Sequence, residues 1–163
     1  MRTHDFEEIR SDFLERVNRM VYCSVATIDG QGRPRSRILH PIWEGSISWI
    51  STNPSSLKAR HLRRNPFVSL AYIHDPAKPL YADCRAELAD DRATKQHVWD
   101  LHLHAEPPLG YDPAPIYGSI DQPNPGGSTF GVLKLTPYRI LLYQFPIPST
   151  IWTSPEIDTD SIA

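Results

Sequence analysis

The residues of this sequence best suited to chemistry are cations that lie close to hydroxyl groups. Arg33, Arg35 and Arg37 occupy alternate positions in the segment RPRSRILHPIW. Alternate residues of a β-strand project from one face, so a strand here would stack three guanidinium groups. Like charges on one sheet face repel, and this arrangement therefore requires an anion or solvent beside it.

A second cation follows in the segment STNPSSLKARHLRRN, where Thr52 ends a predicted strand, Ser56 begins a helix and Lys58 lies in its first turn. A lysine is unfavourable there, because the helix dipole already places about half a positive charge at that end. Free amides, hydroxyls and an ammonium in one place are typical of a phosphate site. The same residues equally fit a solvated helix face beside a hairpin rim of arginines, and these patterns alone leave both interpretations open.

Periodicity along the chain predicts a mainly β protein with flanking helices. Apolar residues recur at helical spacing after Asp5 and after Asp90-Asp91, and both acidic positions suit helix caps. Residues 80–88 alternate strictly between apolar and polar side chains, as a strand with one solvated face does. The predicted helices are 5–19, 57–64 and about a dozen residues after Asp91, and the predicted strands are 20–28, 35–43, 46–52, 67–73, 80–88, 128–136 and 138–145.

Most links between these strands are too short for a parallel crossover, which needs a dozen or more residues. The predicted fold is therefore α+β, an antiparallel β-barrel of about six to seven strands, since closure protects sheet edges. We expect one domain over residues 1–146, which includes a long irregular loop at 105–127, and a proline-rich C-terminal tail at 147–163. Tyr111 and Tyr117 in that loop suit either a lid or a packing role.

Composition argues against several classes of protein. Seventeen basic and nineteen acidic residues leave a near-neutral chain, so no nucleic-acid or membrane partner is expected. The N-terminus carries no signal-peptide pattern, and no apolar run reaches membrane-spanning length, which predicts a cytoplasmic protein. His97, His102 and His104 do not share a helix face, so no metal site is expected. No serine or cysteine pairs with a base, and no catalytic residue is assigned.

The run from Arg33 to Tyr72 resembles the cofactor-binding half of the pyridoxamine 5'-phosphate oxidase-like superfamily of FMN-binding split β-barrels. The resemblance depends on several motifs that occur in one order and at suitable spacings. These are Gly32-x-Pro34, the arginine-led apolar strand, Ser51-Thr52-Asn53, Ser56-x-Lys58, Asn65-Pro66 and Val68-Ser69-Leu70.

This resemblance implies a site for FMN. Arg37 and Lys58 would bind the flavin phosphate, and Ser56 and Thr52 would add hydroxyl groups. The backbone of Ile38, Leu39 and His40 would follow the isoalloxazine edge, with Ser51 at the end of the same pocket. Two subunits share each cofactor in that family, so a homodimer acting on a small-molecule substrate is implied.

The chain departs from the oxidases proper near Ile42, where they carry a substrate-binding lysine, and at its C-terminus, which lacks their tryptophan- and arginine-bearing motif. The resemblance therefore implies an oxidoreductase of the flavin reductase or general stress protein type. One alternative is a reductase that uses the deazaflavin F420, whose anionic tail Arg35, Arg60 or Arg64 would meet. Another is a non-enzymatic barrel that binds a cofactor or nucleic acid.

Overall fold

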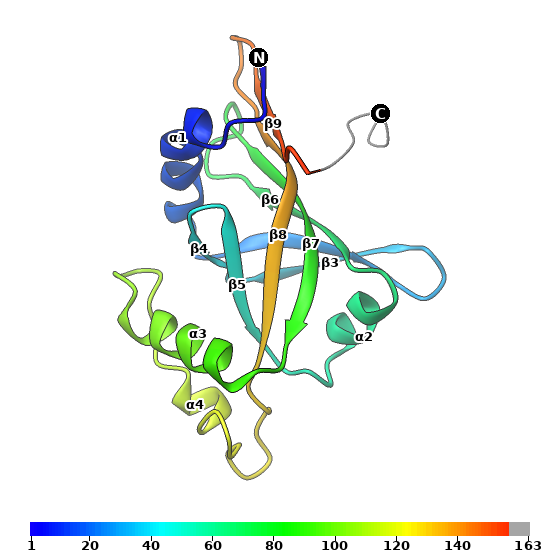
Figure 1. The fold of residues 1–163 in the computed structure, drawn as a ribbon, viewed down its shortest axis with the longest axis vertical. Coiled ribbons are helices and arrows are strands. Elements are labelled where there is room, and N and C mark those ends of the chain that lie inside the picture. The colour runs from blue at the N-terminus through cyan, green and yellow to red at the C-terminus, as the bar shows by residue number, and fades with distance from the viewer. Residues whose placement is uncertain (157–163) are drawn as a thin grey trace.

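A computed structural model describes residues 1–156, which form a curved sheet of nine strands with helices around it (Figure 1). The strands are β1 (Arg2–Thr3), β2 (Cys23–Ile28), β3 (Pro34–Leu39), β4 (Ile42–Glu44), β5 (Ile47–Thr52), β6 (Phe67–Tyr72), β7 (Leu80–Ala89), β8 (Gly131–Leu142) and β9 (Thr150–Thr153). The helices are α1 (Glu7–Asn18), α2 (Leu57–Arg64), α3 (Arg92–His104) and α4 (Ala114–Tyr117). The mainly β, α+β prediction is confirmed.

The strands follow the order β1-β9-β8-β7-β6-β2-β3, with β5 also paired to β8 and β4 paired to β5. All these pairs are antiparallel except β1–β9, which is parallel. Within the described residues no pairing joins β3 to β4 or β5, so the sheet is not closed. Closure into a split barrel therefore stays a prediction.

Three strand predictions need correction. The strand expected over 35–43 is two strands, β3 and β4, because Pro41 has no backbone N–H to continue the ladder. The two strands expected over 128–136 and 138–145 are one, β8, and Pro137 lies at its irregularity opposite Cys84, where a missing donor is tolerated. The expected C-terminal tail contributes β9, which pairs with β1 and β8. Residues 157–163 of that tail lie outside the described residues.

The helices begin where local hydrogen bonds allow them to. Asp5 lies two residues before α1, and its carboxylate accepts the Glu7 amide at 3.0 Å, so the helix begins at residue 7 and not at 5. Asp91 caps α3 as predicted, accepting the Thr94 amide at 2.7 Å. No helix among residues 1–156 is long and apolar enough to cross a bilayer.

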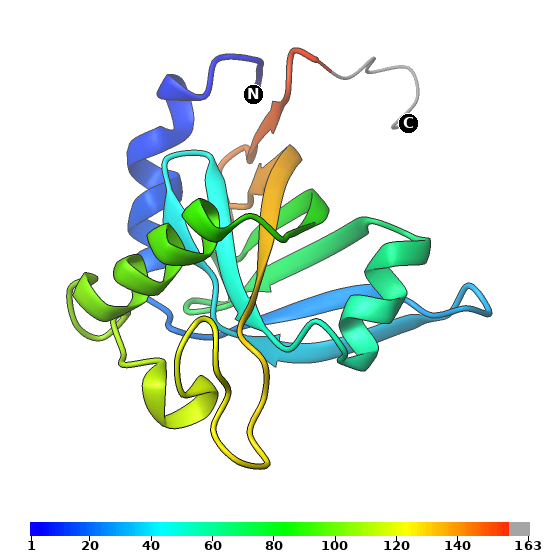
Figure 2. The same cartoon turned by 60° about the horizontal axis from the view of Figure 1, so that its bottom comes forward.

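The main core packs between the sheet and α1, which buries Ile9, Phe13 and Val17. Phe13 meets Trp43 edge to face, with ring centroids 4.8 Å apart. Elsewhere α2 packs against β2 and α3 against β8 (Figure 2). A smaller cluster, formed by Val98, Tyr117, Phe130 and Val132, anchors the 105–127 segment to α3 and β8.

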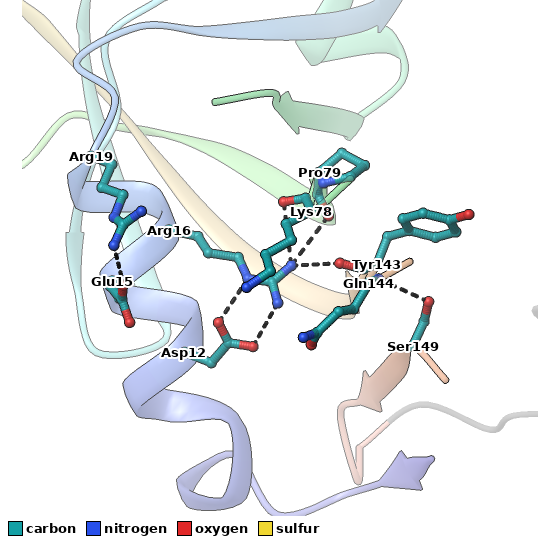
Figure 3. A network of polar contacts seen from close by, with 9 residues as sticks. All are labelled: Asp12, Glu15, Arg16, Arg19, Lys78, Pro79, Tyr143, Gln144 and Ser149. Atoms are coloured by element: carbon teal, nitrogen blue, oxygen red, sulfur yellow. Dashed lines mark hydrogen bonds and ion pairs between the residues drawn. The ribbon is translucent and has the colours of Figure 1, made fainter. Parts of the chain in front are cut away.

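Arg16 of α1 ties this helix to two distant turns (Figure 3). Its Nε donates to Asp12 at 2.7 Å, and its Nη1 donates to the carbonyl oxygens of Lys78 and Tyr143 at 3.3 and 2.7 Å. The side chain is only 12 % exposed, so its methylenes also pack. The guanidinium therefore satisfies carbonyls that water reaches poorly.

Substituting Met for Arg16 is expected to lower the free energy of unfolding by about 2 kcal/mol, because charged hydrogen bonds to these carbonyls are lost while the apolar stem is kept. Urea denaturation followed by circular dichroism measures the difference. Arg10→Met on the same helix is the control, since the Arg10 side chain is hydrogen-bonded only to the exposed Glu7 among residues 1–156. Equal stability of the two variants would contradict the role given to Arg16.

Candidate functional site

Arg37 lies on β3 opposite Val25 of β2, and its Nη1 donates to the Thr27 hydroxyl at 2.8 Å. Thr27 is buried, and its oxygen lies 3.0 Å from Nδ1 of His61, a buried residue of α2. The three side chains therefore link β3, β2 and α2. This network fixes the Arg37 guanidinium beside the helix that carries Lys58.

The two other arginines of the predicted row have an anion within the chain. Arg33 and Arg35 each donate from Nε to Oδ2 of Asp29, at 3.0 and 3.1 Å. The amide of Arg33, then the Gln31 amide and both guanidinium groups, hold the pKa of Asp29 well below its usual range. For Arg33 and Arg35, the anion that the stacked arginines were expected to need is therefore Asp29 of the same hairpin. Arg37 alone of the row has no carboxylate partner among the described residues.

Lys58 lies in the first turn of α2, as the sequence predicted. Ser56 caps this helix, and its hydroxyl accepts the Ala59 amide at 3.3 Å. Burial lowers the pKa of the Lys58 ammonium, and the nearby Arg37 charge lowers it further. In residues 1–156 neither cation forms an ion pair with a carboxylate, so two positive charges face each other without an anion.

Thr52 ends β5 with a buried hydroxyl. Its Oγ1 has no hydrogen-bond partner among the residues that the structure describes. The tight turn that follows, closed by the bond from the Ser56 amide to the Asn53 carbonyl at 3.0 Å, connects Thr52 to the start of α2. A buried hydroxyl without a partner is rare in folded proteins and points to a group that completes it.

These features together fit a phosphate. Arg37 and Lys58 supply charge, Ser56 and Thr52 supply hydroxyl groups, and the first amides of α2 have no intrahelical partner. A dianion bound here would attract both cations and so offset their mutual repulsion. It would also accept hydrogen bonds from these hydroxyl groups and helix amides.

The segment predicted to follow a flavin ring is the end of β3 and its connection to β4. The Ile38 side chain projects outward and is 64 % exposed, whereas Leu39 packs partly against the core. His40 is half-buried, and its ring lies edge to face with Tyr22 at 5.7 Å. Arg37 and Ile38 are neighbours, so phosphate and ring segments are continuous along the strand.

Ser51 lies on the opposite face of β5 from Thr52, because adjacent strand residues project to opposite sides. Its hydroxyl is hydrogen-bonded to the Tyr111 hydroxyl. The Tyr111 ring in turn packs on His40 and on His102 of α3, with centroids 5.3 and 4.8 Å away. Tyr111 therefore brings Ser51 and His40, both predicted from the sequence, into one cluster.

Burial keeps both histidines of this cluster neutral. It lowers the pKa of His102 to about 4, with a further contribution from His40, and it lowers the pKa of His40, although the Leu109 carbonyl acts in the opposite direction. Burial also raises the pKa of Tyr111 to about 12, so its hydroxyl stays protonated. Each ring nitrogen without a proton is thus a free acceptor at pH 7.

Sequence reasoning did not assign Thr27, His61 and His102 to this site. For Thr27 and His61 the sequence did contain a signal that could have been used. Thr27 lies two residues before Asp29, on the strand that pairs with the arginine row. His102 had none, because its place depends on how α3 crosses the sheet. In the described residues no three histidine, cysteine or acidic side chains are placed to hold a metal ion.

A family model described as pyridoxamine 5'-phosphate oxidase matches residues 9–108. No curated protein matches the sequence. Among solved structures, a Clostridium acetobutylicum protein related to general stress protein 26 of B. subtilis is 21 % identical, with a TM-score of 0.69 over 96 % of this chain and 99 % of that one.

Two further solved structures are similar in fold. An F420 reductase is 18 % identical, with a TM-score of 0.57 over 78 % of this chain and 94 % of that one. A heme binding protein from Mycobacterium smegmatis is 19 % identical, with a TM-score of 0.66 over 91 % of this chain and 57 % of that one.

Proposed function

Because the chain belongs to the pyridoxamine 5'-phosphate oxidase-like family, we propose that it is an FMN-binding oxidoreductase that acts on a small molecule. The observation that carries this proposal is the pair of cations at the start of α2. Arg37 and Lys58 come from distant parts of the chain, lie near each other and have no carboxylate partner in the described residues. Such a pair destabilises a protein unless an anion binds between the two charges.

The proposed roles follow the geometry. Arg37 and Lys58 would hold the flavin phosphate, while the Ser56 and Thr52 hydroxyls would complete its hydrogen bonds. The backbone of Ile38, Leu39 and His40 would orient the ring, with Ser51 at its far end. The bound flavin would supply two-electron redox chemistry, and the protein would supply position and electrostatics.

The deazaflavin F420 is a second candidate, because α2 carries two further arginines that have no anionic partner in the described residues. Arg60 and Arg64 are exposed on α2 and form no ion pair within residues 1–156, and Arg64 reaches the β2–β3 turn at Gly30. These cations would meet a longer anionic tail. The fold likeness to an F420 reductase supports the same alternative.

Absorbance and mass spectrometry of the freshly purified protein decide between these candidates. A flavin spectrum and release of FMN on denaturation are expected. Where no cofactor is retained, titration with FMN and with F420 compares the two affinities directly. Tighter binding of F420 would replace the FMN proposal, and binding of neither compound would refute both.

We further propose that two copies of the chain share the cofactor. Three large apolar side chains, Tyr22, Ile38 and Phe67, are exposed on adjacent strands or just before them, with exposed fractions of 60, 64 and 51 %. Small residues such as Ser24 and Ala26 separate them on the same sheet face, which leaves a flat surface. Apolar side chains gathered in this way are typical of an interface.

A charge on this face is expected to prevent assembly. Phe67→Asp should convert a dimer into a monomer by light scattering at micromolar concentration, because a desolvated carboxylate would oppose the interface. Ile147→Asp is the control, since Ile147 is also exposed but lies between β8 and β9, outside the strands that form this face. A wild-type protein that is monomeric, or a Phe67→Asp variant that stays dimeric, contradicts the proposed face.

A further inference from the structure

The cluster beneath Tyr111 contains buried polar atoms that the fold leaves without partners. Nε2 of His40 and both ring nitrogens of His102 have no hydrogen-bond partner among the described residues. His102 is completely buried. Since buried polar groups are almost always paired, three such nitrogens side by side indicate a place where another polar group binds.

Tyr111 covers these imidazoles without satisfying them. Its ring packs on both histidines, but its only polar group, the hydroxyl, is bonded to Ser51. The Tyr111 amide donates to the His102 carbonyl at 2.7 Å, which holds the segment in place. The ring nitrogens of His40 and His102 are therefore desolvated without a hydrogen bond in return, and a polar ligand would relieve this cost.

The geometry points to a ligand class. The neutral His102 imidazole presents one N–H donor and one acceptor, Nε2 of His40 adds a further polar atom without a partner, and Ser51 adds a hydroxyl that can donate or accept. We propose that His40, His102 and Ser51 form a binding subsite for the polar edge of a planar heterocycle, and that Tyr111 leaves this subsite when the heterocycle enters. This inference deepens the proposed function and rests on it, because the ring expected here is that of the flavin.

Release of Tyr111 would break two hydrogen bonds. The segment before it follows a tight path, in which a Cβ on Gly110 would lie 2.1 Å from the Ala105 carbonyl oxygen. Withdrawing the side chain breaks the bond to Ser51 and the amide bond to His102, while the anchor at Tyr117 and Phe130 can stay. Gly110→Ala forces this path to shift, because the added Cβ would meet the Ala105 carbonyl, and we expect the shift to displace the adjacent Tyr111.

Lumiflavin, which has the ring but no phosphate, tests the subsite independently of Arg37 and Lys58. Tyr111→Ala and Gly110→Ala are expected to bind lumiflavin about tenfold more tightly than the wild type, because the fraction of chains with an open subsite rises. Adding His102→Leu to Tyr111→Ala should cancel that gain. Tyr143→Ala, a partly exposed tyrosine on the far hairpin, should leave the affinity unchanged.

Weaker or equal binding of lumiflavin by Tyr111→Ala would overturn the inference, because Tyr111 would then either contribute to binding by stacking or take no part in it. A gain that persists with His102→Leu would overturn it as well. Circular dichroism confirms that each variant is folded, and Gly110→Ala provides the same test should Tyr111→Ala unfold. If the Arg37 and Lys58 variants keep FMN while Tyr111→Ala binds lumiflavin more tightly, only the phosphate proposal fails. If those variants lose FMN while Tyr111→Ala shows no gain in lumiflavin binding, only the subsite proposal fails.

Discussion

Alanine at Arg37 or at Lys58 is expected to weaken FMN binding by about 1.5–3 kcal/mol in each case, which is the usual contribution of a hydrogen bond to a charged group. Both side chains are partly buried, and the bond to Thr27 holds Arg37 in place, so little ordering of Arg37 is needed when a phosphate binds. Flavin fluorescence during titration of the cofactor-stripped protein gives the dissociation constants. An increase of at least tenfold in each variant is the expected result.

Arg35→Ala is the matched control for this prediction. Arg35 lies on the same strand two residues before Arg37, but Asp29 already neutralises it. It should therefore change FMN binding far less than Arg37→Ala does. Equal losses in the two variants would mean that a general positive field attracts the cofactor, and not a clamp built from Arg37 and Lys58.

The same site should show an opposite effect on stability. The pKa of Lys58 is lowered by burial and by Arg37, so its charged form destabilises the fold at every pH below the ordinary lysine value. Lys58→Met is therefore expected to stabilise the cofactor-stripped chain to heat while it weakens FMN binding. A variant that loses both stability and binding would instead identify Lys58 as a structural residue.

Acidification from pH 6.5 to pH 4 is expected to cost the fold about 3 kcal/mol through His102 alone. Its pKa is about 4 in the fold, against 6.5 for an exposed histidine. Above pH 6.5 both states are neutral and nothing changes. Below pH 6.5 the His102 imidazole binds a proton in the unfolded chain but not in the folded chain, so the free energy of unfolding falls steadily until pH 4. His40, whose pKa burial also lowers, acts in the same direction.

This pH window separates the histidines from the carboxylates. Asp29 and Asp91 also have lowered pKa values, but their contribution is lost only below the ordinary aspartate pKa of 3.8. His102→Leu should remove most of the dependence between pH 6.5 and 4, measured by urea denaturation at fixed pH. His104→Gln, at an exposed residue two positions further along α3, is the control. If the free energy of unfolding of His102→Leu depends on pH between 6.5 and 4 as the wild type does, the His102 imidazole does not titrate in this range.

Local chemistry in the sequence was enough to predict the elements that carry the proposed phosphate site. Ser56 begins α2 because its hydroxyl can accept a helix amide, and Asn65 ends it because Pro66 follows. Alternation predicted β2, β5 and β7 for similar reasons. Pro41 and Pro137 were harder to interpret, since proline breaks one strand here and lies within an irregularity of the other.

Contacts between distant segments account for what the sequence could not provide. Asp29 neutralises Arg33 and Arg35 only because the hairpin turns back at Gly32, whose φ of 76° places both guanidiniums over the carboxylate. His102 meets His40 through the crossing of α3 over the sheet, and Tyr111 arrives from a segment without periodicity. Neither spacing nor composition contains that information.

Comparison of FMN with riboflavin tests the central claim most directly, because the two ligands differ only in the phosphate. The wild-type protein should bind FMN at least a hundredfold more tightly, and the Arg37→Ala/Lys58→Ala double variant should lose most of this preference, since only hydroxyl groups and helix amides remain for the phosphate. A wild type that does not distinguish FMN from riboflavin, or a double variant that prefers FMN as strongly as the wild type does, would contradict the proposed phosphate site.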